Sequence, residues 1–323
     1  MIICGRDSWT KLKLIGNGGS SKVYKAEVCS NKQSIAVKEI FRDDLSDRQI
    51  EDLRKEFNIV KELNHINIIK YLYIFEGSNK LYMCLEYADR GCLRQFYLKK
   101  GPLNEGQASN CMRQLLRGLE FIHSKGIAHR DIKAANLLLN CEGTIKLADF
   151  GSCKPFDIES STSELKGTPQ WMAPEVIKGL QLTIGWIKAD IWSVGCTLVE
   201  VITGKIPYFY YENPMTAMFH IANGKLPLSE DYFDLSSRAK DFVLSCCALN
   251  PNLRKDVKDL LSMQFVSICS PLLSPPSHNL IYSSVEFNSG SFLNTSSQNK
   301  ENQTENCDNN KIRSINKNSS NIK

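Results

Sequence analysis

Apolar residues in the first part of the chain come in short, strand-like stretches separated by polar and glycine-rich turns. Five such stretches predict strands at residues 9–15, 21–28, 35–40, 68–75 and 80–86. One segment has a different period, because its apolar residues recur every three or four positions, and it predicts an amphipathic helix over residues 47–63. Residues 9–88 therefore predict a small β-rich lobe with one helix.

From residue 90 onward the pattern is mainly helical. Stretches with helical periodicity predict helices at residues 107–124, 188–203, 211–223, 236–248 and 257–263. Residues 89–267 therefore predict a larger α-rich lobe, and the two lobes together an α+β fold. A cleft between two lobes is a natural site for a small molecule.

Two further segments flank the predicted lobes. Residues 1–8 are interpreted as a short leader. Residues 268–323 form a tail in which 12 Ser and 11 Asn make up 23 of 56 residues. Such a polar segment cannot bury enough apolar surface to offset the entropy of ordering, so a mostly disordered tail is predicted.

The overall composition narrows the class of protein. With 323 residues, 42% apolar residues and a net charge of +5, the chain has an ordinary globular composition and too little charge to indicate nucleic-acid binding. The most apolar stretch, residues 191–202, is too short to cross a bilayer and contains Glu200, so no membrane span is expected. The 12 cysteines lack any C-x-x-C pair, which argues against a zinc site or disulfide scaffold and predicts a cytoplasmic protein, with the nucleus as the alternative.

A glycine-rich turn joins the first two predicted strands and reads Ile15-Gly16-Asn17-Gly18-Gly19-Ser20-Ser21-Lys22-Val23. Glycines let the backbone fold closely over a phosphate chain and direct N–H groups at it. A strand follows the turn where a dinucleotide-binding motif would need a helix. Glycine turns between strands are common, so a plain structural turn is the alternative to a phosphate site.

Two charged residues of the small lobe occupy apolar surroundings. Lys38 lies in a predicted strand, and it needs anionic partners if it points into the cleft rather than outward. Glu56 lies in the predicted helix between the core-facing Leu53 and Phe57, and its carboxylate is one candidate partner. An exposed lysine and a solvated glutamate are the alternative interpretation.

The most specific cluster is His129-Arg130-Asp131, followed by Lys133 and Asn136. A carboxylate such as Asp131 can accept a hydroxyl proton, a lysine can stabilise a transferring phosphoryl group, and an amide oxygen can bind a hard cation. Asp149-Phe150-Gly151 comes thirteen residues after Asn136, and a carboxylate beside a glycine can face a metal. Taken singly, each piece could be a solvated charged loop.

Taken in order, these segments resemble the eukaryotic protein kinases. The matching segments are the glycine-rich loop, Ala36-Val37-Lys38, Glu56, His129-Arg130-Asp131, Asn136, Asp149-Phe150-Gly151, Ala173-Pro174-Glu175 and Asp190-Ile191-Trp192-Ser193-Val194-Gly195. The resemblance covers residues 9–267 and implies the bilobal kinase fold, with an N-lobe at 9–88 and a C-lobe at 89–267. It implies ATP and Mg²⁺ as the small molecules bound between them.

The resemblance also implies roles for the chemical residues. Asp131 would orient and deprotonate the acceptor hydroxyl, Lys133 would contact the γ-phosphate, and Asn136 and Asp149 would hold Mg²⁺. Lys38 would hold the α- and β-phosphates and pair with Glu56. The backbone of the loop Ile15, Gly16, Asn17, Gly18, Gly19, Ser20, Ser21, Lys22 and Val23 would cover the phosphates.

The adenine site follows from the same resemblance. Leu85 resembles the gatekeeper, and Glu86, Tyr87 and Ala88 resemble the hinge, whose backbone would bind the adenine edge. The residues that would sandwich the ring are Val23, Ala36 and Leu138. Arg254 resembles the arginine that buries an ion pair with Glu175.

Two segments indicate the acceptor and the branch of the family. Lys133 and Gly167-Thr168-Pro169 are similar to serine/threonine kinases, in which Thr168 would link Asp131 and Lys133 by hydrogen bonds. The segments 167–177 and 189–197 are most similar to the MAP kinase kinase kinase branch, which implies a downstream MAP kinase kinase-like protein as substrate. A kinase of a mitotic or septation group is the alternative, because residues 18–24 also resemble that group.

The sequence also suggests a way to regulate the domain and an alternative in which it has no activity. Arg130 would bind a phosphate that an upstream kinase or autophosphorylation adds to the activation segment. The candidate acceptors of that phosphate are Ser160, Ser161, Thr162 and Ser163.

A pseudokinase scaffold would require the loss of a chemical group. It is disfavoured because all five such residues are present, namely Lys38, Glu56, Asp131, Asn136 and Asp149.

Overall fold

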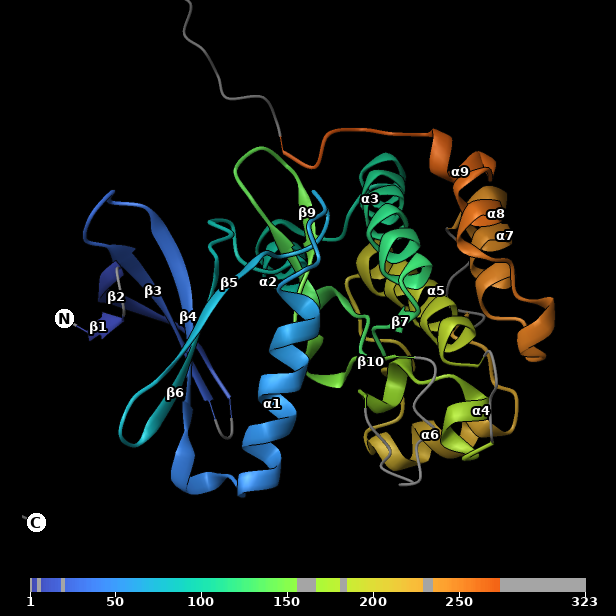
Figure 1. Cartoon of the computed structure of the whole chain (residues 1–323). Coiled ribbons are helices and arrows are strands. Elements are labelled where there is room, and N and C mark those ends of the chain that lie inside the picture. Colours follow the sequence, from blue (N-terminus) through green and yellow to red (C-terminus); the bar gives the residue numbers. More distant parts are fainter. Residues whose placement is uncertain are drawn as a thin grey trace, which may run out of the picture. The chain divides into compact units, whose positions relative to one another are not determined.

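The computed structural model describes residues 2–4, 7–18, 21–155, 167–180, 185–228 and 235–273. Among these residues, no helix is long and apolar enough to cross a membrane. The described part folds into the two predicted lobes, a strand-rich one and a helical one (Figure 1).

The small lobe is a six-stranded antiparallel sheet with strand order β1-β2-β3-β4-β6-β5 (Figure 1). Its strands are β1 (Ile2–Cys4), β2 (Asp7–Asn17), β3 (Ser21–Val28), β4 (Ser34–Phe41), β5 (Tyr71–Glu76) and β6 (Lys80–Glu86). The five predicted strands are confirmed, with ends that differ by a few residues. The sequence missed β1, which lies in the predicted leader, because three residues are too few to show a period.

The single helix of this lobe is α1 (Asp47–Val60). It begins at a capping box: Ser46 Oγ accepts a hydrogen bond from the backbone N–H of Gln49, and the Gln49 side chain accepts one from the backbone N–H of Ser46. The helix ends three residues before the predicted end, although the buried Leu63 continues the apolar pattern into the following turn.

Strand register divides the sheet into two faces. Val23 of β3 lies opposite Lys38 of β4, and Ala36 of β4 lies opposite Leu85 of β6. Because side chains alternate along a strand, these four residues share one face of the sheet. The other face carries a separate apolar cluster, in which Trp9 contacts Tyr82 edge to face with ring centroids 5.6 Å apart. The predicted nucleotide-facing residues are thus on the same side of the sheet.

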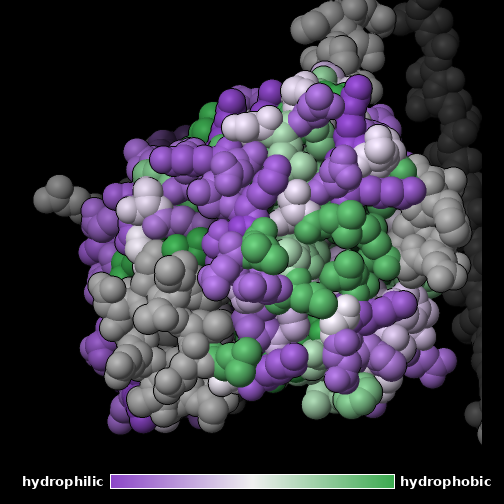
Figure 2. Space-filling view, turned by 90° about the vertical axis from the view of Figure 1, so that its right-hand side faces the viewer, coloured by the Kyte–Doolittle hydropathy of each residue, from purple (hydrophilic) through white to green (hydrophobic). Residues whose placement is uncertain are grey.

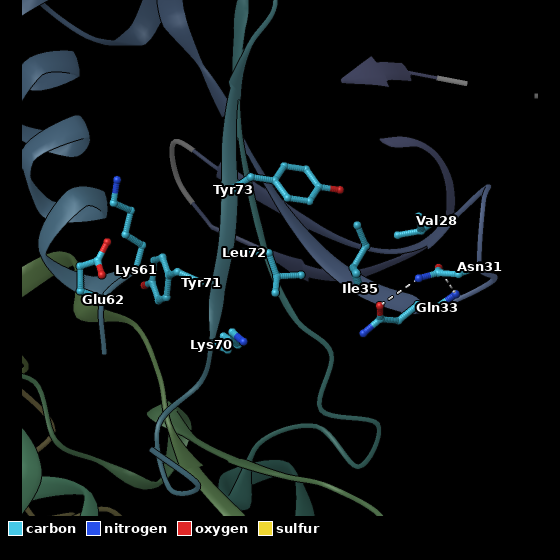
Figure 3. Close-up of a pocket in the computed structure, with 10 residues that line it drawn as sticks. All are labelled: Val28, Asn31, Gln33, Ile35, Lys61, Glu62, Lys70, Tyr71, Leu72 and Tyr73. Atoms are coloured by element: carbon cyan, nitrogen blue, oxygen red, sulfur yellow. Dashed lines mark hydrogen bonds between the residues drawn. The ribbon is translucent and has the colours of Figure 1, made fainter. Parts of the chain in front are cut away.

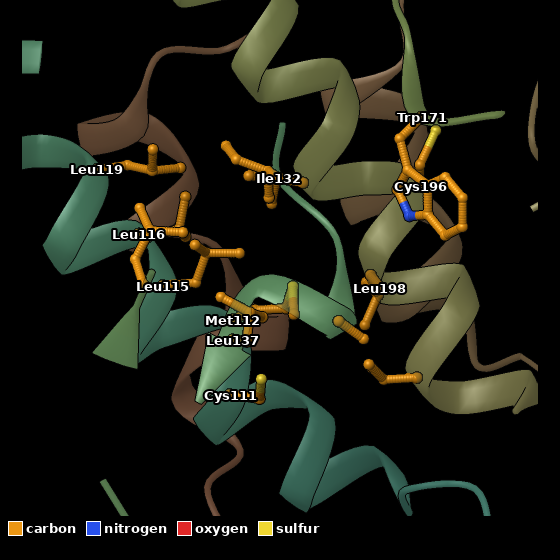
Figure 4. Packing of buried hydrophobic residues seen from close by; sticks show 14 of the residues in the cluster. Cys111, Met112, Leu115, Leu116, Leu119, Ile132, Leu137, Trp171, Cys196 and Leu198 are labelled. Carbon is orange, nitrogen blue, oxygen red and sulfur yellow. The ribbon is translucent and has the colours of Figure 1, made fainter. Parts of the chain in front are cut away.

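The large lobe is built around α5 (Gly185–Thr203), which is mostly apolar and is buried from Ala189 to Val201. Its other helices are α2 (Leu93–Lys100), α3 (Glu105–Ser124), α4 (Pro174–Ile177), α6 (Pro214–Ala222), α7 (Ser237–Cys246), α8 (Val257–Leu261) and α9 (Gln264–Ser267). Figure 4 shows Leu115, Leu116 and Leu119 of α3 and Leu198 of α5 among the buried side chains of this core. The five predicted helices are confirmed, and the short α2, α4 and α9 are additional.

Four short strands complete the large lobe. Strand β7 (Ile127–Ala128) pairs with β10 (Lys154–Pro155), and β8 (Leu137–Leu139) pairs with β9 (Ile145–Leu147). The predicted catalytic residues Asp131, Lys133 and Asn136 lie between β7 and β8. These strands are too short for a sequence pattern to reveal.

The packed structure continues past residue 267, where the sequence pattern places the start of the tail. The backbone N–H of Ser270 donates to the carbonyl oxygen of Gly106 at 3.0 Å, and the Asn110 side chain donates to the carbonyl oxygen of Ser270 at 3.0 Å. Leu272 is buried. Residues 268–273 therefore belong to the large lobe, against α3, whereas the rest of the predicted tail lies outside the described residues.

One face of the large lobe is less polar than the surrounding surface. Figure 2 shows apolar side chains gathered near the middle of that view. Exposed apolar residues of this lobe include Leu244 in α7 and, just after it, Leu249 and Leu253, the last of which is 73% exposed.

Candidate active site

The carboxylate of Asp131 is held by three side chains. Its Oδ1 accepts a hydrogen bond from Thr168 Oγ1 at 2.7 Å, and its Oδ2 accepts bonds from Lys133 Nζ at 2.7 Å and Asn136 Nδ2 at 2.9 Å. Lys133 Nζ also donates to Thr168 Oγ1 at 2.6 Å. The predicted link from Thr168 to Asp131 and Lys133 is confirmed. A carboxylate fixed in this way can accept a proton from a hydroxyl group brought up to it.

The loop that carries Asp131 is anchored to α5. Asp190 Oδ2 accepts the backbone N–H of His129 at 2.8 Å, and Asp190 Oδ1 accepts the backbone N–H of Arg130 at 2.7 Å. The ring of His123 contacts the same carboxylate at 2.8 Å. The sequence indicated Asp190 only as the first residue of a family motif. The structure shows that its carboxylate holds the backbone of the two residues that precede Asp131.

His129 is buried and acts as a structural link between two loops. Its Nδ1 accepts the backbone N–H of Asp131 at 3.3 Å, which places the ring proton on Nε2, 3.1 Å from the carbonyl oxygen of Ala148. Burial lowers the pKa of His129 below its ordinary value despite the nearby carboxylates. The ring therefore stays neutral near pH 7 and ties the Asp131 loop to the residue before Asp149.

Asp149 faces the small lobe. Its Oδ1 lies 3.3 Å from Lys38 Nζ, and its backbone is in the left-handed region at φ 64°. Partial burial opposes ionisation of this carboxyl, but the positive charges around it, Lys38 first, together offset that effect, so the pKa of Asp149 lies below its ordinary value. The sequence expected Glu56 as the partner of Lys38. Glu56 lies in α1, but its side chain is outside the described residues, and the ion pair that the structure shows for Lys38 is with Asp149.

A chain of aromatic rings positions Phe150, the residue after Asp149. Its ring contacts His129 at 5.0 Å and Tyr71 of β5 at 6.2 Å, both edge to face, and Tyr71 contacts Phe57 of α1 at 6.1 Å. These rings connect the helix of the small lobe with the catalytic loop. The sequence did not reveal this chain, because its members are separated by up to about a hundred residues.

Asn136 and Asp149 are brought together by the backbone. The N–H of Ala148 donates to the carbonyl oxygen of Asn136 at 2.9 Å, and Asn136 Nδ2 donates to Asp131. Because Nδ2 makes these contacts, the amide oxygen is the atom that can face a cation. One carboxylate and one amide oxygen fit Mg²⁺, which takes few protein ligands and completes its shell with phosphate oxygens and water.

The hinge candidates lie at the end of β6 and just beyond it. The Glu86 carboxylate accepts from Lys146 Nζ at 2.8 Å and from the backbone N–H of Lys70 at 3.2 Å. Its side chain is therefore tied to β9 and to the residue before β5, and its backbone N–H donates to the carbonyl oxygen of Lys70 at 2.9 Å. Leu138 of β8 is half-buried on the large-lobe side, and Ala88 lies between Glu86 and α2.

Several predicted positions lie outside the described residues. They are Gly19 and Ser20 of the glycine-rich loop, the Glu56 side chain, and Ser160, Ser161, Thr162 and Ser163. The described flanks of the loop approach each other, since the backbone N–H of Gly18 donates to the carbonyl oxygen of Ser21 at 2.8 Å. Ile15, Gly16 and Asn17 form the end of β2, and Lys22 and Val23 lie in β3.

Glu200 of α5 is a second buried carboxyl that the sequence did not assign. It accepts bonds from Tyr97 OH at 3.0 Å, Trp171 Nε1 at 3.1 Å and the backbone N–H of Ala134 at 3.0 Å. Burial raises the pKa of Glu200 in spite of these three donors. Glu200 thus joins α2, the segment after Thr168 and the catalytic loop. The sequence signal available for it was a glutamate inside an apolar helix.

A cavity of about 520 Å³ in the small lobe is separate from this site (Figure 3). It is lined by residues from the end of α1, from β5 and from the turn between β3 and β4, with Leu72 near the centre of the view. None of the catalytic or nucleotide-binding candidates lines it. The chemistry is therefore assigned to the cluster of side chains that contains Asp131, Asp149 and Lys38.

Comparison with known proteins agrees with this geometry. The family model described as "Protein kinase domain" matches residues 9–266. The chain belongs to the protein kinase family. Its domain is similar to those of proteins named as MAP kinase kinase kinases.

Similar proteins occur in a plant and in fungi. The chain is 40% identical over 270 residues to Mitogen-activated protein kinase kinase kinase ANP1 of Arabidopsis thaliana, covering 80% of this chain and 40% of that protein. It is 38% identical over 274 residues to Mitogen-activated protein kinase kinase kinase YODA of the same plant, covering 83% of this chain and 30% of YODA. The chain thus spans less than half the length of these relatives.

The septation alternative also has relatives. The chain is 38% identical over 252 residues to Cytokinesis protein sepH of Aspergillus terreus, covering 78% of this chain and 18% of that protein. This alternative is less supported than the MAP kinase kinase kinase branch, whose members match at up to 40% identity and over more of the chain.

Replacing Thr168 by valine should lower kcat about tenfold and leave the KM for ATP nearly unchanged. Valine keeps the shape but removes the hydroxyl that orients Asp131 and Lys133. Initial rates of phosphate transfer measure the effect. Thr203→Val is the control, because the Thr203 hydroxyl bonds only to backbone near the end of α5. An unchanged kcat in Thr168→Val would show that the bond does not orient the catalytic group.

Proposed function

We propose that this domain transfers the γ-phosphoryl group of ATP to serine or threonine hydroxyls of a protein substrate, with Mg²⁺ as the metal. The observation that carries the proposal is the Asp131 carboxylate held by Thr168, Lys133 and Asn136, beside the paired Asp149 and Lys38. This set contains a proton acceptor, two cations for phosphate oxygens and two oxygen ligands for a hard metal.

Each residue has a distinct task in this proposal. Asp131 orients the acceptor hydroxyl and takes its proton, while Lys133 balances charge on the transferred group. Lys38 binds phosphate oxygens, and the backbone from Ile15 to Val23 covers them. Asn136 and Asp149 would hold Mg²⁺, which supplies positive charge to the phosphates when bound.

The similarity to one branch of the family supports a proposal about the protein substrate and the regulation. The relatives are named as MAP kinase kinase kinases, which supports a MAP kinase kinase-like protein as acceptor. Phosphate on the segment that contains Ser160, Ser161, Thr162 and Ser163, added by an upstream kinase or by the domain itself, would pair with Arg130 and raise activity. We place the protein in the cytoplasm, which imaging of a tagged chain would test.

The experiment uses the purified full chain, Mg-ATP and a catalytically inactive MAP kinase kinase as acceptor. We expect Mg²⁺-dependent phosphorylation of serine or threonine in that acceptor, and weaker transfer by a variant with all four activation-segment hydroxyls changed to alanine. Labelling of general substrates but not of the MAP kinase kinase would contradict the assigned cascade. Equal activity of the quadruple variant would contradict the assigned switch.

A further inference from the structure

The side chain of Arg130 is stacked on an aromatic ring. Its guanidinium carbon lies 3.7 Å from the centroid of the Trp186 ring, and the residue is only 8% exposed. Trp186 is the second residue of α5 and lies outside all of the motifs that carry the family resemblance. The arginine beside the catalytic aspartate is therefore held by a residue for which the sequence suggested no role.

The same helix holds the backbone of Arg130. Asp190 follows Trp186 by four residues, so both lie on one face of α5. Asp190 Oδ1 accepts the Arg130 backbone N–H at 2.7 Å, while the Trp186 ring covers the guanidinium. One helix face thus fixes both the main chain and the side chain of the residue that precedes Asp131.

Arg130 needs such support because its backbone is strained. Its φ is 70°, in the left-handed region that side chains other than glycine rarely adopt. Its carbonyl oxygen also packs closely against Gly167, where an added Cβ would lie only 2.9 Å away. Arg130 therefore lies between the catalytic Asp131 and the segment that supplies Thr168, and its conformation affects both.

We propose that Trp186 is a positioning residue for phosphoryl transfer, acting through Arg130. Stacking uses the flat face of the guanidinium and not its in-plane N–H edge. The ring thereby sets the plane of Arg130, stabilises the strained turn before Asp131, and keeps the Asp131 carboxylate in register with Thr168. The proposal rests on the kinase activity described above.

The test compares Trp186→Ala and Trp186→Phe, each made in the wild-type chain and in an Arg130→Met background. In the wild-type chain, Trp186→Ala should lower kcat about tenfold with the KM for ATP within about twofold, and Trp186→Phe should restore most of the loss. In the Arg130→Met background, Trp186→Ala should change kcat by less than about twofold, because the contact through which Trp186 acts is already gone.

Three kinetic results would overturn the proposal. They are an unchanged kcat in Trp186→Ala, an equal loss in Trp186→Phe, and an equally large loss when Trp186→Ala is added to Arg130→Met. The last result would mean that Trp186 supports the fold independently of Arg130. Thermal melting of each variant identifies a protein that fails to fold, and the phenylalanine variant then carries the comparison.

A second readout does not depend on activity. The ring current of Trp186 should shift the Nε–H proton signal of Arg130 upfield in the NMR spectrum, and Arg130→Met assigns that signal by removing it. The shift should disappear in Trp186→Ala and persist in part in Trp186→Phe. An unshifted signal in the wild-type chain would overturn the stacking itself, whereas a wild-type chain that stacks but transfers no phosphate would count against the proposed function instead.

Discussion

Replacing Asp131 by asparagine should lower kcat by about 10²–10⁴-fold, the range that general-base catalysis contributes. Asparagine keeps the shape of the side chain and can still interact with Thr168 and Lys133, but it cannot accept the hydroxyl proton. Nucleotide affinity should remain within about twofold, because Asp131 is assigned to the acceptor and not to ATP. Initial-rate assays and titration calorimetry measure the two quantities on the same preparation.

Asp241→Asn provides the matched control for this change. Asp241 is an exposed residue of α7, in the lobe that also carries Asp131, so the same loss of charge there should leave both kcat and nucleotide affinity unchanged. A kcat for Asp131→Asn within threefold of wild type would contradict the assignment of the proton acceptor. A parallel loss of ATP binding would mean that the variant disturbs the nucleotide site.

Replacing Arg254 by methionine should reduce the free energy of unfolding by about 3–5 kcal/mol. Arg254 and Glu175 form a fully buried ion pair, with Arg254 Nη2 2.7 Å from Glu175 Oε2 and Arg254 Nη1 bonded to the other carboxylate oxygen. Arg254 also donates to the carbonyl oxygens of Lys188 at 2.9 Å and Ala248 at 2.8 Å. Its loss leaves a buried carboxylate without a counterion, which is the costly part of the change.

The double variant Glu175→Gln with Arg254→Met tests that reason. Removing both charges should recover a large part of the lost stability, since no isolated charge then remains buried. Lys55→Met, at the exposed Glu51–Lys55 pair of α1, should leave the denaturation midpoint nearly unchanged. Chemical denaturation measures all three. A single variant as stable as wild type would show that the pair does not hold the segment after Ala173 to the large lobe.

The sequence predicted the parts of the site that occur as local motifs. Asp131, Lys133 and Asn136 lie within six residues, and a short loop fixes their mutual distances once its ends are held. Thr168 could be added because its bonds to Asp131 and Lys133 follow from the family resemblance. The expected pair between Arg254 and Glu175 is confirmed for the same reason.

What the sequence could not predict depends on contacts between distant segments. The sequence offered Glu56 as the carboxylate partner of Lys38, and only the placement of the lobes brings Asp149 to a distance of 3.3 Å from it. Glu200 appeared only as a residue of an apolar helix, and Trp186 lay two residues before the predicted start of that helix. Helical periodicity shows which side of a helix is buried but not which loop lies against it. The burial of Leu272 could not be predicted for a related reason, because this residue lies in a predominantly polar segment that begins at residue 268.

The most direct measurement is the transfer of label from γ-labelled ATP by the purified chain, followed by analysis of the phosphorylated amino acids. Phosphoserine and phosphothreonine should form in the presence of Mg²⁺, phosphotyrosine should not, and chelation of the metal should stop the reaction. A folded chain that binds Mg-ATP in calorimetry, yet labels neither itself nor any added protein, would contradict the account and favour a scaffold with a nucleotide site.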